Sequence, residues 1–253
     1  MQARTKNLVP LFESTIMTKS KASAQAPRLF ADFRQMFDEM ARDIDAVIVS
    51  TPDHTHFVAA MWALKHRKHI CVQKPLCNTI WEVRELHRAA KAAGVVTQMG
   101  NQGRTSEGHR LAKEWIEQGV IGTLKEIRLW TNRPIWPQGP MNKKSVACPP
   151  NLNWDLWLAS EPDEPYFEFD VPEGQSGKAR KAGQLEWASS IVNGGKTSSG
   201  FDYSAPLSEF VQLGNLAIRS GQTIQWDAAP MRVTNVAAAN RFIKRFVYRQ
   251  GWL

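Results

Sequence analysis

Short apolar runs alternate along this chain with longer segments in which apolar residues recur every three or four positions. Apolar runs of strand length lie at 44–50, 68–72 and 95–99. Helical spacing of apolar residues occurs at 33–40, 53–66, 79–93 and 105–118. An alternating segment at 124–131 predicts a fourth strand. Helices and strands in this order are typical of α/β proteins, in which a parallel sheet carries helices on its faces.

Three helices have end signals in the sequence. Asp32 stands where a capping residue would precede the helix at 33–40. Thr79 and Glu82 have the spacing of a capping box, and Gly94 stands where helices commonly end in a left-handed residue. Near the other end of the chain, Pro206 and Gly221 predict the first turn and the end of another helix. The buried stripe of that helix is predicted to be Leu207, Phe210, Val211, Gly214 and Ile218. In the helix at 105–118, the residues predicted to face inward are Leu111 and Trp115.

The sequence pattern changes after residue 132. Prolines become frequent and aromatic residues lose their periodicity, which indicates a domain boundary. Short helices are predicted at 153–158 and 185–192, with a loop over 163–183 between them. We therefore divide the chain into a poorly structured N-terminus at 1–26, an α/β domain at 27–131 and a C-terminal domain at 132–253.

Composition narrows the class of protein. Lys and Arg total 32 against 24 acidic residues, but the excess is spread thinly, without the focused basic stripe of nucleic-acid binders. No long uncharged apolar run is present, so we expect no membrane segment. The three cysteines lack metal-type spacing and suit a reducing compartment. We expect a cytoplasmic protein, although a truncated N-terminus would hide an export leader.

Polar side chains gather where the three predicted strands end. These residues are Thr51, Pro52, His54 and His56, then Gln73, Lys74 and Pro75, then Asn101 and Gln102. Open parallel sheets bind ligands outside the carboxyl ends of their strands, so we expect Lys74, His56 and Asn101 to lie around one crevice. Arg133 and Trp136 follow the predicted fourth strand, where an arginine suits a carboxylate or a phosphate.

These segments resemble the Gfo/Idh/MocA oxidoreductases, the glucose–fructose oxidoreductase and inositol dehydrogenase superfamily. Residues 45–56 are similar to the family's fourth strand with its T-P-x-x-x-H turn, residues 68–76 to its K-H-V-x-x-E-K-P signature, and residues 94–102 to the strand that follows. Further segments, which resemble one bacterial subgroup, lie at 130–139, 201–219, 225–227 and 251–252. The likeness covers most of 27–160 and 184–253.

The resemblance implies a partial Rossmann-like parallel sheet with flanking helices, followed by a reduced α+β C-terminal domain. It implies that 27–131 is an incomplete nucleotide-binding domain and that 132–253 is a remnant of the C-terminal substrate and oligomerisation domain. It implies NAD or NADP as the cofactor and hydride transfer on a carbohydrate-like substrate, namely a sugar, polyol or related hydroxy compound. Lys74 is then the catalytic residue, because its Nζ can donate a hydrogen bond to the reacting hydroxyl or exchange a proton with it. The implied cofactor contacts are Thr51, Pro52, His54, His56, Gln73, Lys74, Pro75 and Asn101. The implied substrate contacts are Gln102, Arg133 and Trp136.

Other interpretations stay open for these residues. Lys74 is alternatively a surface lysine at the start of a loop, and Asn101 is alternatively part of a turn. Asp53, His54 and His56 lie close together, but no further ligand is evident, so no metal site is expected. A rival activity within the same superfamily is NAD-dependent glycoside cleavage, in which the substrate is oxidised transiently.

Two departures from the family pattern change the expectation. The family opens with a glycine-rich turn that holds the dinucleotide pyrophosphate at a helix N-terminus, but the first glycine of this chain is Gly94. Cofactor binding is therefore expected to be impaired. Between Glu168 and Leu185 a short loop replaces about a hundred residues of the family's C-terminal domain. These departures favour a non-catalytic fragment or scaffold as the alternative, and an exposed sheet edge predicts homo-oligomers.

Overall fold

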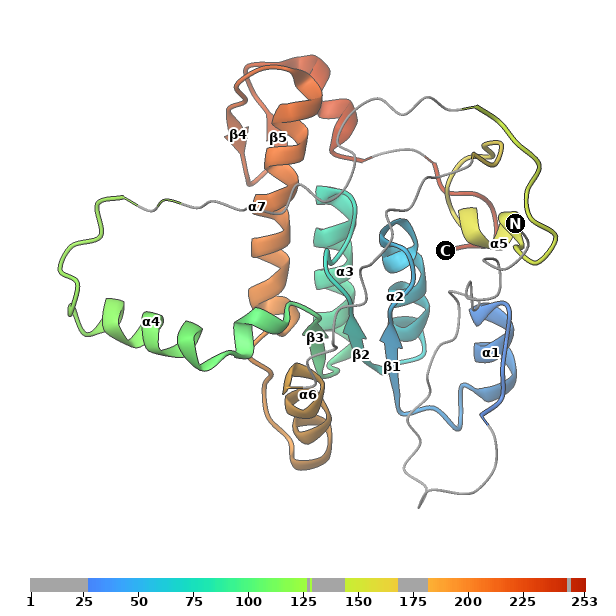
Figure 1. Ribbon diagram of the computed structural model, residues 1–253, viewed down its shortest axis with the longest axis horizontal. Coiled ribbons are helices and arrows are strands. Elements are labelled where there is room, and N and C mark those ends of the chain that lie inside the picture. The colour runs from blue at the N-terminus through green and yellow to red at the C-terminus, as the bar shows by residue number, and fades with distance from the viewer. Residues whose placement is uncertain (1–26, 127, 129–143, 168–181, 245–246) are drawn as a thin grey trace, which may run out of the picture.

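A computed structural model describes residues 27–126, 128, 144–167, 182–244 and 247–253. Its central sheet consists of β1 (Ala46–Val49), β2 (His69–Val72) and β3 (Thr97–Met99), which pair in parallel in that order. In this register Val47 lies beside Ile70, and Ile70 lies beside Thr97. The three apolar runs therefore form the parallel sheet that the sequence predicts, and the Rossmann-like α/β class is confirmed (Figure 1).

The predicted fourth strand is wrong where it can be checked. Residues 124–126 and 128 form no strand, and Leu124 is 47% exposed. A strand needs a neighbour with free backbone groups, and the outer edge of β3 is already occupied. Met99 N donates to Ser199 O at 2.8 Å, so a segment a hundred residues further along covers this edge.

Helices cover the two faces of the sheet unequally. On one face, α2 (His56–Lys65), α3 (Ile80–Ala93) and α7 (Phe201–Ser220) pack over the apolar side chains of the strands (Figure 1). The opposite face is covered by α6 (Ala182–Asn193), whose Trp187 packs with Ala46 and Cys71. The main hydrophobic core therefore lies on the α2–α3 side, next to the edge where the strands end.

The local end signals of the early helices are confirmed. Helix α1 (Phe33–Met40) is capped by Asp32, whose side chain accepts from Arg34 N at 2.8 Å. Thr79 and Glu82 form both bonds of the capping box at the start of α3. Gly94 ends α3 at φ 64°, a conformation that favours glycine.

Helix α4 (Glu107–Glu117) does not pack as predicted. Leu111 is 39% exposed and Trp115 is 50% exposed, and none of its described side chains is buried. The 3-10 turn η3 (Gln102–Thr105) precedes it, and the helix extends away from the sheet (Figure 1). Its apolar stripe is real, but no described element covers it.

Helix α7 differs most from the prediction. It begins after Gly200, so Pro206 lies inside the helix rather than in its first turn. The predicted stripe is mostly exposed, since Phe210 is 74% and Ile218 is 79% exposed. The buried face instead contains Ser204, Ala205, Ser208, Gln212 and Leu216. Polar side chains are stable there because they bond to the strand-end loops: Gln212 Nε2 donates to Cys77 O at 2.8 Å.

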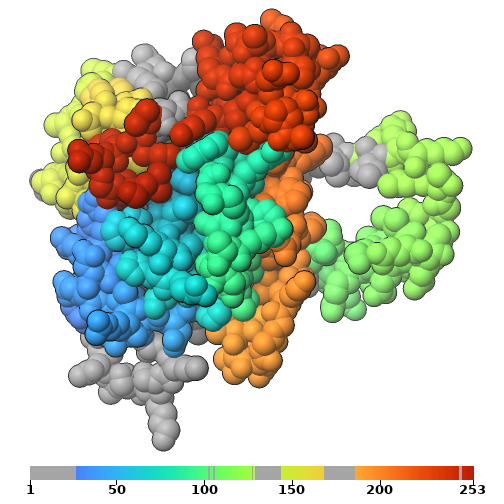
Figure 2. Space-filling model, turned by 180° about the vertical axis from the view of Figure 1, so that it is seen from behind, coloured from blue at the N-terminus to red at the C-terminus, as the bar shows by residue number. Residues whose placement is uncertain are grey.

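The C-terminal region packs onto the N-terminal helices. Helix α5 (Trp154–Leu158) and α6 confirm the two predicted short helices, although Gly183 belongs to α6 and not to the loop. A two-stranded hairpin, β4 (Trp226–Asp227) and β5 (Arg232–Val233), precedes the 3-10 helix η4 (Ala237–Phe242). The last residues then lie against α1 and α2, where Trp62 Nε1 donates to Trp252 O at 3.0 Å (Figure 2). No helix in the described ranges is long and apolar enough to cross a membrane.

Candidate functional site

The residues that follow the three strands lie at one edge of the sheet. Gln73 N donates to Val49 O and Gly100 N donates to Val72 O, so the ladder of hydrogen bonds continues into these loops. A Cβ atom on Gly100 would overlap the carboxamide of Gln73, so glycine is needed for that side chain to lie across the edge. Parallel pairing of β1, β2 and β3 thus brings Thr51, Gln73 and Asn101 onto adjacent strand ends.

His56 connects the loop that follows β1 with the loop that follows β2. Its ring is fully buried, with Nδ1 2.7 Å from Pro75 O and Nε2 2.9 Å from Thr51 O. A neutral imidazole donates to one of these carbonyls, and it donates to both only when both nitrogens carry protons. The ring therefore connects the two loops and does not face solvent, and contact between His56 and a cofactor stays a prediction.

The loop that carries Lys74 is fixed at several points. His56 binds Pro75 O, Gln212 binds Cys77 O, and one carboxylate oxygen of Glu82 accepts from Asn78 N at 3.0 Å. The peptide bond between Lys74 and Pro75 is cis. Lys74 itself is exposed, and no described residue pairs with its ammonium group. The backbone of this loop is therefore held while the charged end of Lys74 remains available.

Glu82 anchors the loop and is itself buried. Its Oε2 accepts from Thr79 N at 3.0 Å, and its Oε1 accepts from Tyr248 Oη at 2.7 Å. Burial raises the pKa of Glu82, while hydrogen bonds from Tyr248, Asn78 and Thr79 act in the opposite direction. Burial and the nearby Glu82 charge also raise the pKa of Tyr248. A carboxylate at this position is thus stabilised only by the partners that surround it.

His54 connects the end of β1 to the C-terminal region. Its Nε2 lies 2.7 Å from Trp157 O, and the two rings are 4.5 Å apart at their centroids. Both predicted histidines are therefore occupied by backbone carbonyls. Among the described residues, no group of three or more His, Cys, Asp or Glu side chains is placed to hold a metal ion.

The remaining site candidates differ in what the structure says of them. Asn101 is half-buried and its Oδ1 accepts from Ser199 Oγ. Gln102 begins the turn η3, where its backbone is placed. Arg133 and Trp136 lie outside the described residues. Lys74, His56 and Asn101 come from adjacent strand ends, and of these three only Lys74 is exposed.

Sequence reasoning missed the partners that hold these loops in place. These partners are Trp157, Ser199, Gln212 and Tyr248. Each is about a hundred residues or more from the residue that it contacts, so no local pattern indicates the contact. The polar face of α7 was the one available signal, because Ser204, Ser208 and Gln212 recur at helical spacing.

Comparisons with known proteins agree with the strand-end motifs. Residues 2–101 match the model of an oxidoreductase family with an NAD-binding Rossmann fold, GFO_IDH_MocA, and the match starts ahead of the predicted domain boundary at residue 27. Levoglucosan dehydrogenase of Pseudarthrobacter phenanthrenivorans is 32% identical over 49% of this chain and 34% of its own length. The 1,5-anhydro-D-fructose reductase of Ensifer adhaerens is 38% identical over 32% of this chain and 24% of its own length.

A solved inositol dehydrogenase homolog from Azotobacter vinelandii, complexed with NAD+, is 35% identical over 37% of this chain and 25% of its own. Its TM-score of 0.34 is too low to support a structural conclusion. The chain spans only 34% and 24% of the lengths of the two curated relatives named above. Residues 2–101 are therefore similar to the Gfo/Idh/MocA oxidoreductases, a family described by its NAD-binding Rossmann fold.

Proposed function

We propose that this chain is a nicotinamide-dependent oxidoreductase that acts on a sugar, a polyol or a related hydroxy compound. The observation that carries the proposal is the Lys74 loop, whose backbone is fixed by His56, Gln212 and Glu82 while the ammonium group stays exposed. Relatives named for reactions on anhydrosugars support this substrate class. A charged donor fixed at the carboxyl edge of a parallel sheet suits a reacting hydroxyl oxygen.

The residues at the strand ends fit the nicotinamide half of a dinucleotide better than its pyrophosphate. Thr51, Gln73, Lys74 and Asn101 offer donors and acceptors along the strand ends, as a nicotinamide riboside requires. The pyrophosphate normally lies at a helix N-terminus that a glycine-rich turn leaves open. Here the sequence has no glycine before Gly94, and the N-terminus of α3 is filled by the side chain of Glu82. NAD or NADP would therefore bind weakly and mainly through the nicotinamide half.

Lys74 carries the proton chemistry in this proposal. A bound nicotinamide ring would supply the hydride acceptor. Lys74 Nζ donates a hydrogen bond that orients the substrate oxygen, and it exchanges a proton with that oxygen during oxidation. In the reverse direction the ammonium returns that proton to the carbonyl oxygen. We place Gln102, Arg133 and Trp136 on the substrate side and Thr51, Pro52 and His54 on the cofactor side of the same crevice.

We also propose that the protein is cytoplasmic and forms homo-oligomers. Free thiols at Cys71, Cys77 and Cys148 suit a reducing compartment. Exposed apolar side chains on α4 and α7 favour contacts with a further copy. The division of the chain into two domains near residue 131 stays a proposal as well. Phe201 and Trp252 lie beyond that boundary, yet they pack in the same core as the first helices.

Titration with NADH and NADPH, followed by tryptophan fluorescence, tests the cofactor part. We expect saturation with a dissociation constant of about 1 mM or weaker, and about a threefold loss in Lys74→Ala. Lys113→Ala, on the exposed helix α4, is the matched control and should bind like the parent. The same samples are then assayed with NAD+ and either myo-inositol or levoglucosan, and Lys74→Ala should lose turnover.

A second candidate function is a non-catalytic scaffold, favoured by the lack of glycine before Gly94. Absence of saturable binding, or absence of turnover in the parent, would replace the oxidoreductase proposal with this one. Equal turnover in the parent and Lys74→Ala would instead refute the role of Lys74. Binding in the micromolar range would instead show that the pyrophosphate is held by residues other than a glycine-rich turn.

A further inference from the structure

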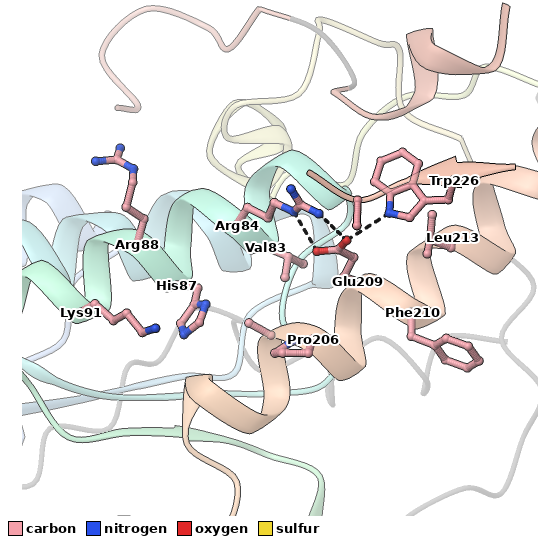
Figure 3. Close-up of a pocket in the computed structure, with 12 residues that line it drawn as sticks. Val83, Arg84, His87, Arg88, Lys91, Pro206, Glu209, Phe210, Leu213 and Trp226 are labelled. Carbon is pink, nitrogen blue, oxygen red and sulfur yellow. Dashed lines mark hydrogen bonds and ion pairs between the residues drawn. The ribbon is translucent and has the colours of Figure 1, made fainter. Parts of the chain in front are cut away.

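A cavity lies away from the strand ends, between α3 and α7. It has a volume of about 560 Å³, within the range of small-molecule sites. We call it the α3–α7 groove, and its lining residues include Arg84, His87, Arg88, Lys91, Pro206, Glu209, Phe210, Leu213 and Trp226 (Figure 3). No residue of the Lys74 loop lines it, so this groove is separate from the proposed active site.

The two walls of the groove differ in chemistry. Arg84, His87, Arg88 and Lys91 recur on one face of α3 at spacings of three and four residues. The α7 wall is apolar apart from Glu209, and Pro206, Phe210 and Leu213 belong to it. Three permanent cations thus lie in the lining beside an apolar surface, with Glu209 as the carboxylate inside the groove. Glu85 and Asp202, which pair with Arg88 and Lys91, are outside the lining.

At one end of the groove, the polar side chains already bond to one another. Arg84 holds Glu209 with two hydrogen bonds of 2.8 and 2.7 Å, and Trp226 Nε1 donates to the same carboxylate at 3.3 Å (Figure 3). A carboxylate with three donors has little capacity for another ligand. This end therefore closes the groove and offers no site for a charged group.

At the opposite end of the groove, the side chains of Lys91 and Arg88 are largely exposed. Lys91 Nζ lies 3.6 Å from Asp202 Oδ1, beyond a normal hydrogen bond, and its side chain is 65% exposed. His87 donates to the same carboxylate at 2.8 Å, and both side chains point into the space beside Pro206 (Figure 3). Arg88 stands at the rim, where its described partner is Glu85 on its own helix. An anionic group placed here would meet Lys91 and Arg88.

We propose that the α3–α7 groove binds a small carboxylate with an apolar, aromatic body. The carboxylate meets Lys91 and Arg88, and the body lies along Pro206 and Phe210 toward Leu213. Phe210 is 74% exposed, so covering its ring removes apolar surface from water. Charge complementarity at one end and apolar contact along the wall are both needed, which separates this ligand from a simple anion and from a neutral hydrophobe.

Calorimetric titration of the full chain with phenylbutyrate tests the proposal. We expect saturable binding that weakens about fivefold in Arg88→Gln/Lys91→Gln and about threefold in Phe210→Ala. Because these three side chains are largely exposed, the variants should keep the parent's circular dichroism and melting temperature. Lys113→Gln on α4 is the charge-matched control and should bind with the parent's affinity.

Two further ligands complete the test. The uncharged amide of phenylbutyrate and inorganic phosphate should each bind at least about fivefold more weakly than the carboxylate. The proposal is overturned by equal affinity for the amide, by equal affinity for phosphate, or by unchanged binding in the double variant. Absence of saturable phenylbutyrate binding to the folded parent overturns it too. None of these outcomes depends on nicotinamide binding or on Lys74.

Discussion

Tyr248 Oη donates a 2.7 Å hydrogen bond to Glu82 Oε1, although the two residues are 166 positions apart in the chain. Glu82 in turn accepts from the backbone of Asn78 and Thr79, at the end of the Lys74 loop. The C-terminal segment therefore helps to hold the loop on which the proposed chemistry depends. Two elements that look unrelated in the sequence act on one buried carboxylate.

Loss of the tyrosine hydroxyl should destabilise the fold. Tyr248→Phe leaves Glu82 Oε1 buried without this donor, and we expect the free energy of unfolding to fall by about 1–3 kcal/mol. Urea denaturation followed by circular dichroism measures the change. Tyr203→Phe is the control, because its exposed ring keeps its contact with Arg104. An unchanged midpoint in Tyr248→Phe would show that the bond contributes nothing.

The raised pKa of Glu82 predicts a pH dependence of stability. Since the folded protein holds this proton more tightly than the unfolded chain, its contribution is full below about pH 4.5, the ordinary value. That contribution is lost as the pH rises through the folded-state pKa. Glu82→Gln removes the titration, so its stability relative to the parent should improve as the pH rises from about 4.5 through the folded-state pKa. A constant difference across this range in urea melts would contradict the assignment.

His56 should matter for the order of the Lys74 loop. His56→Leu removes both carbonyl contacts and leaves Pro75 O and Thr51 O without the ring. We expect about 2 kcal/mol less stability and faster amide exchange over residues 73–79, measured by mass spectrometry. His109→Leu, on the exposed face of α4, should change neither quantity. Unaltered exchange in His56→Leu would mean that the other anchors suffice.

Gly100 and Gln73 should show coupling in a double-mutant cycle. Gly100→Ala forces the flexible Gln73 carboxamide away and should cost no more than about 1 kcal/mol. Gln73→Ala should remove most of that cost, because the overlapping group is gone. Gly108→Ala, in α4 with open space around it, should instead stabilise the protein by up to about 1 kcal/mol. Additive effects at positions 73 and 100 would refute the overlap.

The exposed apolar side of α7 predicts self-association. Ile218→Lys replaces a side chain that is 79% exposed, so it should reduce association in light scattering without lowering the melting temperature. Leu216→Lys places a charge at a site that is 2% exposed and should unfold the protein. A parent protein that is monomeric at all concentrations would argue against any role for this surface in assembly.

Local signals predicted the early helices well, because Asp32, Thr79 and Gly94 act within a few residues of themselves. The face of α7 was not predictable in the same way. Its apolar stripe suggested burial of Phe210 and Ile218, while the strand-end loops offered partners for polar groups instead. The tertiary hydrogen bond from Gln212 to Cys77 O favours burial of the polar side of α7.

The candidate site was predictable to a similar degree. Parallel pairing brought Thr51, Gln73 and Asn101 to adjacent strand ends, as the strand-end rule requires. Whether a side chain faces solvent or holds the backbone depends on neighbours far along the chain. His56 and Lys74 look alike as polar residues after strands, yet one is enclosed and the other is exposed.

The packing of Trp252 on the first helices has a consequence during synthesis. Trp62, whose indole donates to Trp252 O, leaves the ribosome 190 residues earlier. At ordinary elongation rates of about 5–20 residues per second, α1 and α2 wait roughly 10 to 40 seconds for that partner. During this interval the apolar surface of α1 and α2 can bind chaperones or other nascent chains. Synthesis on a polysome is therefore the stage at which this protein misassembles most easily.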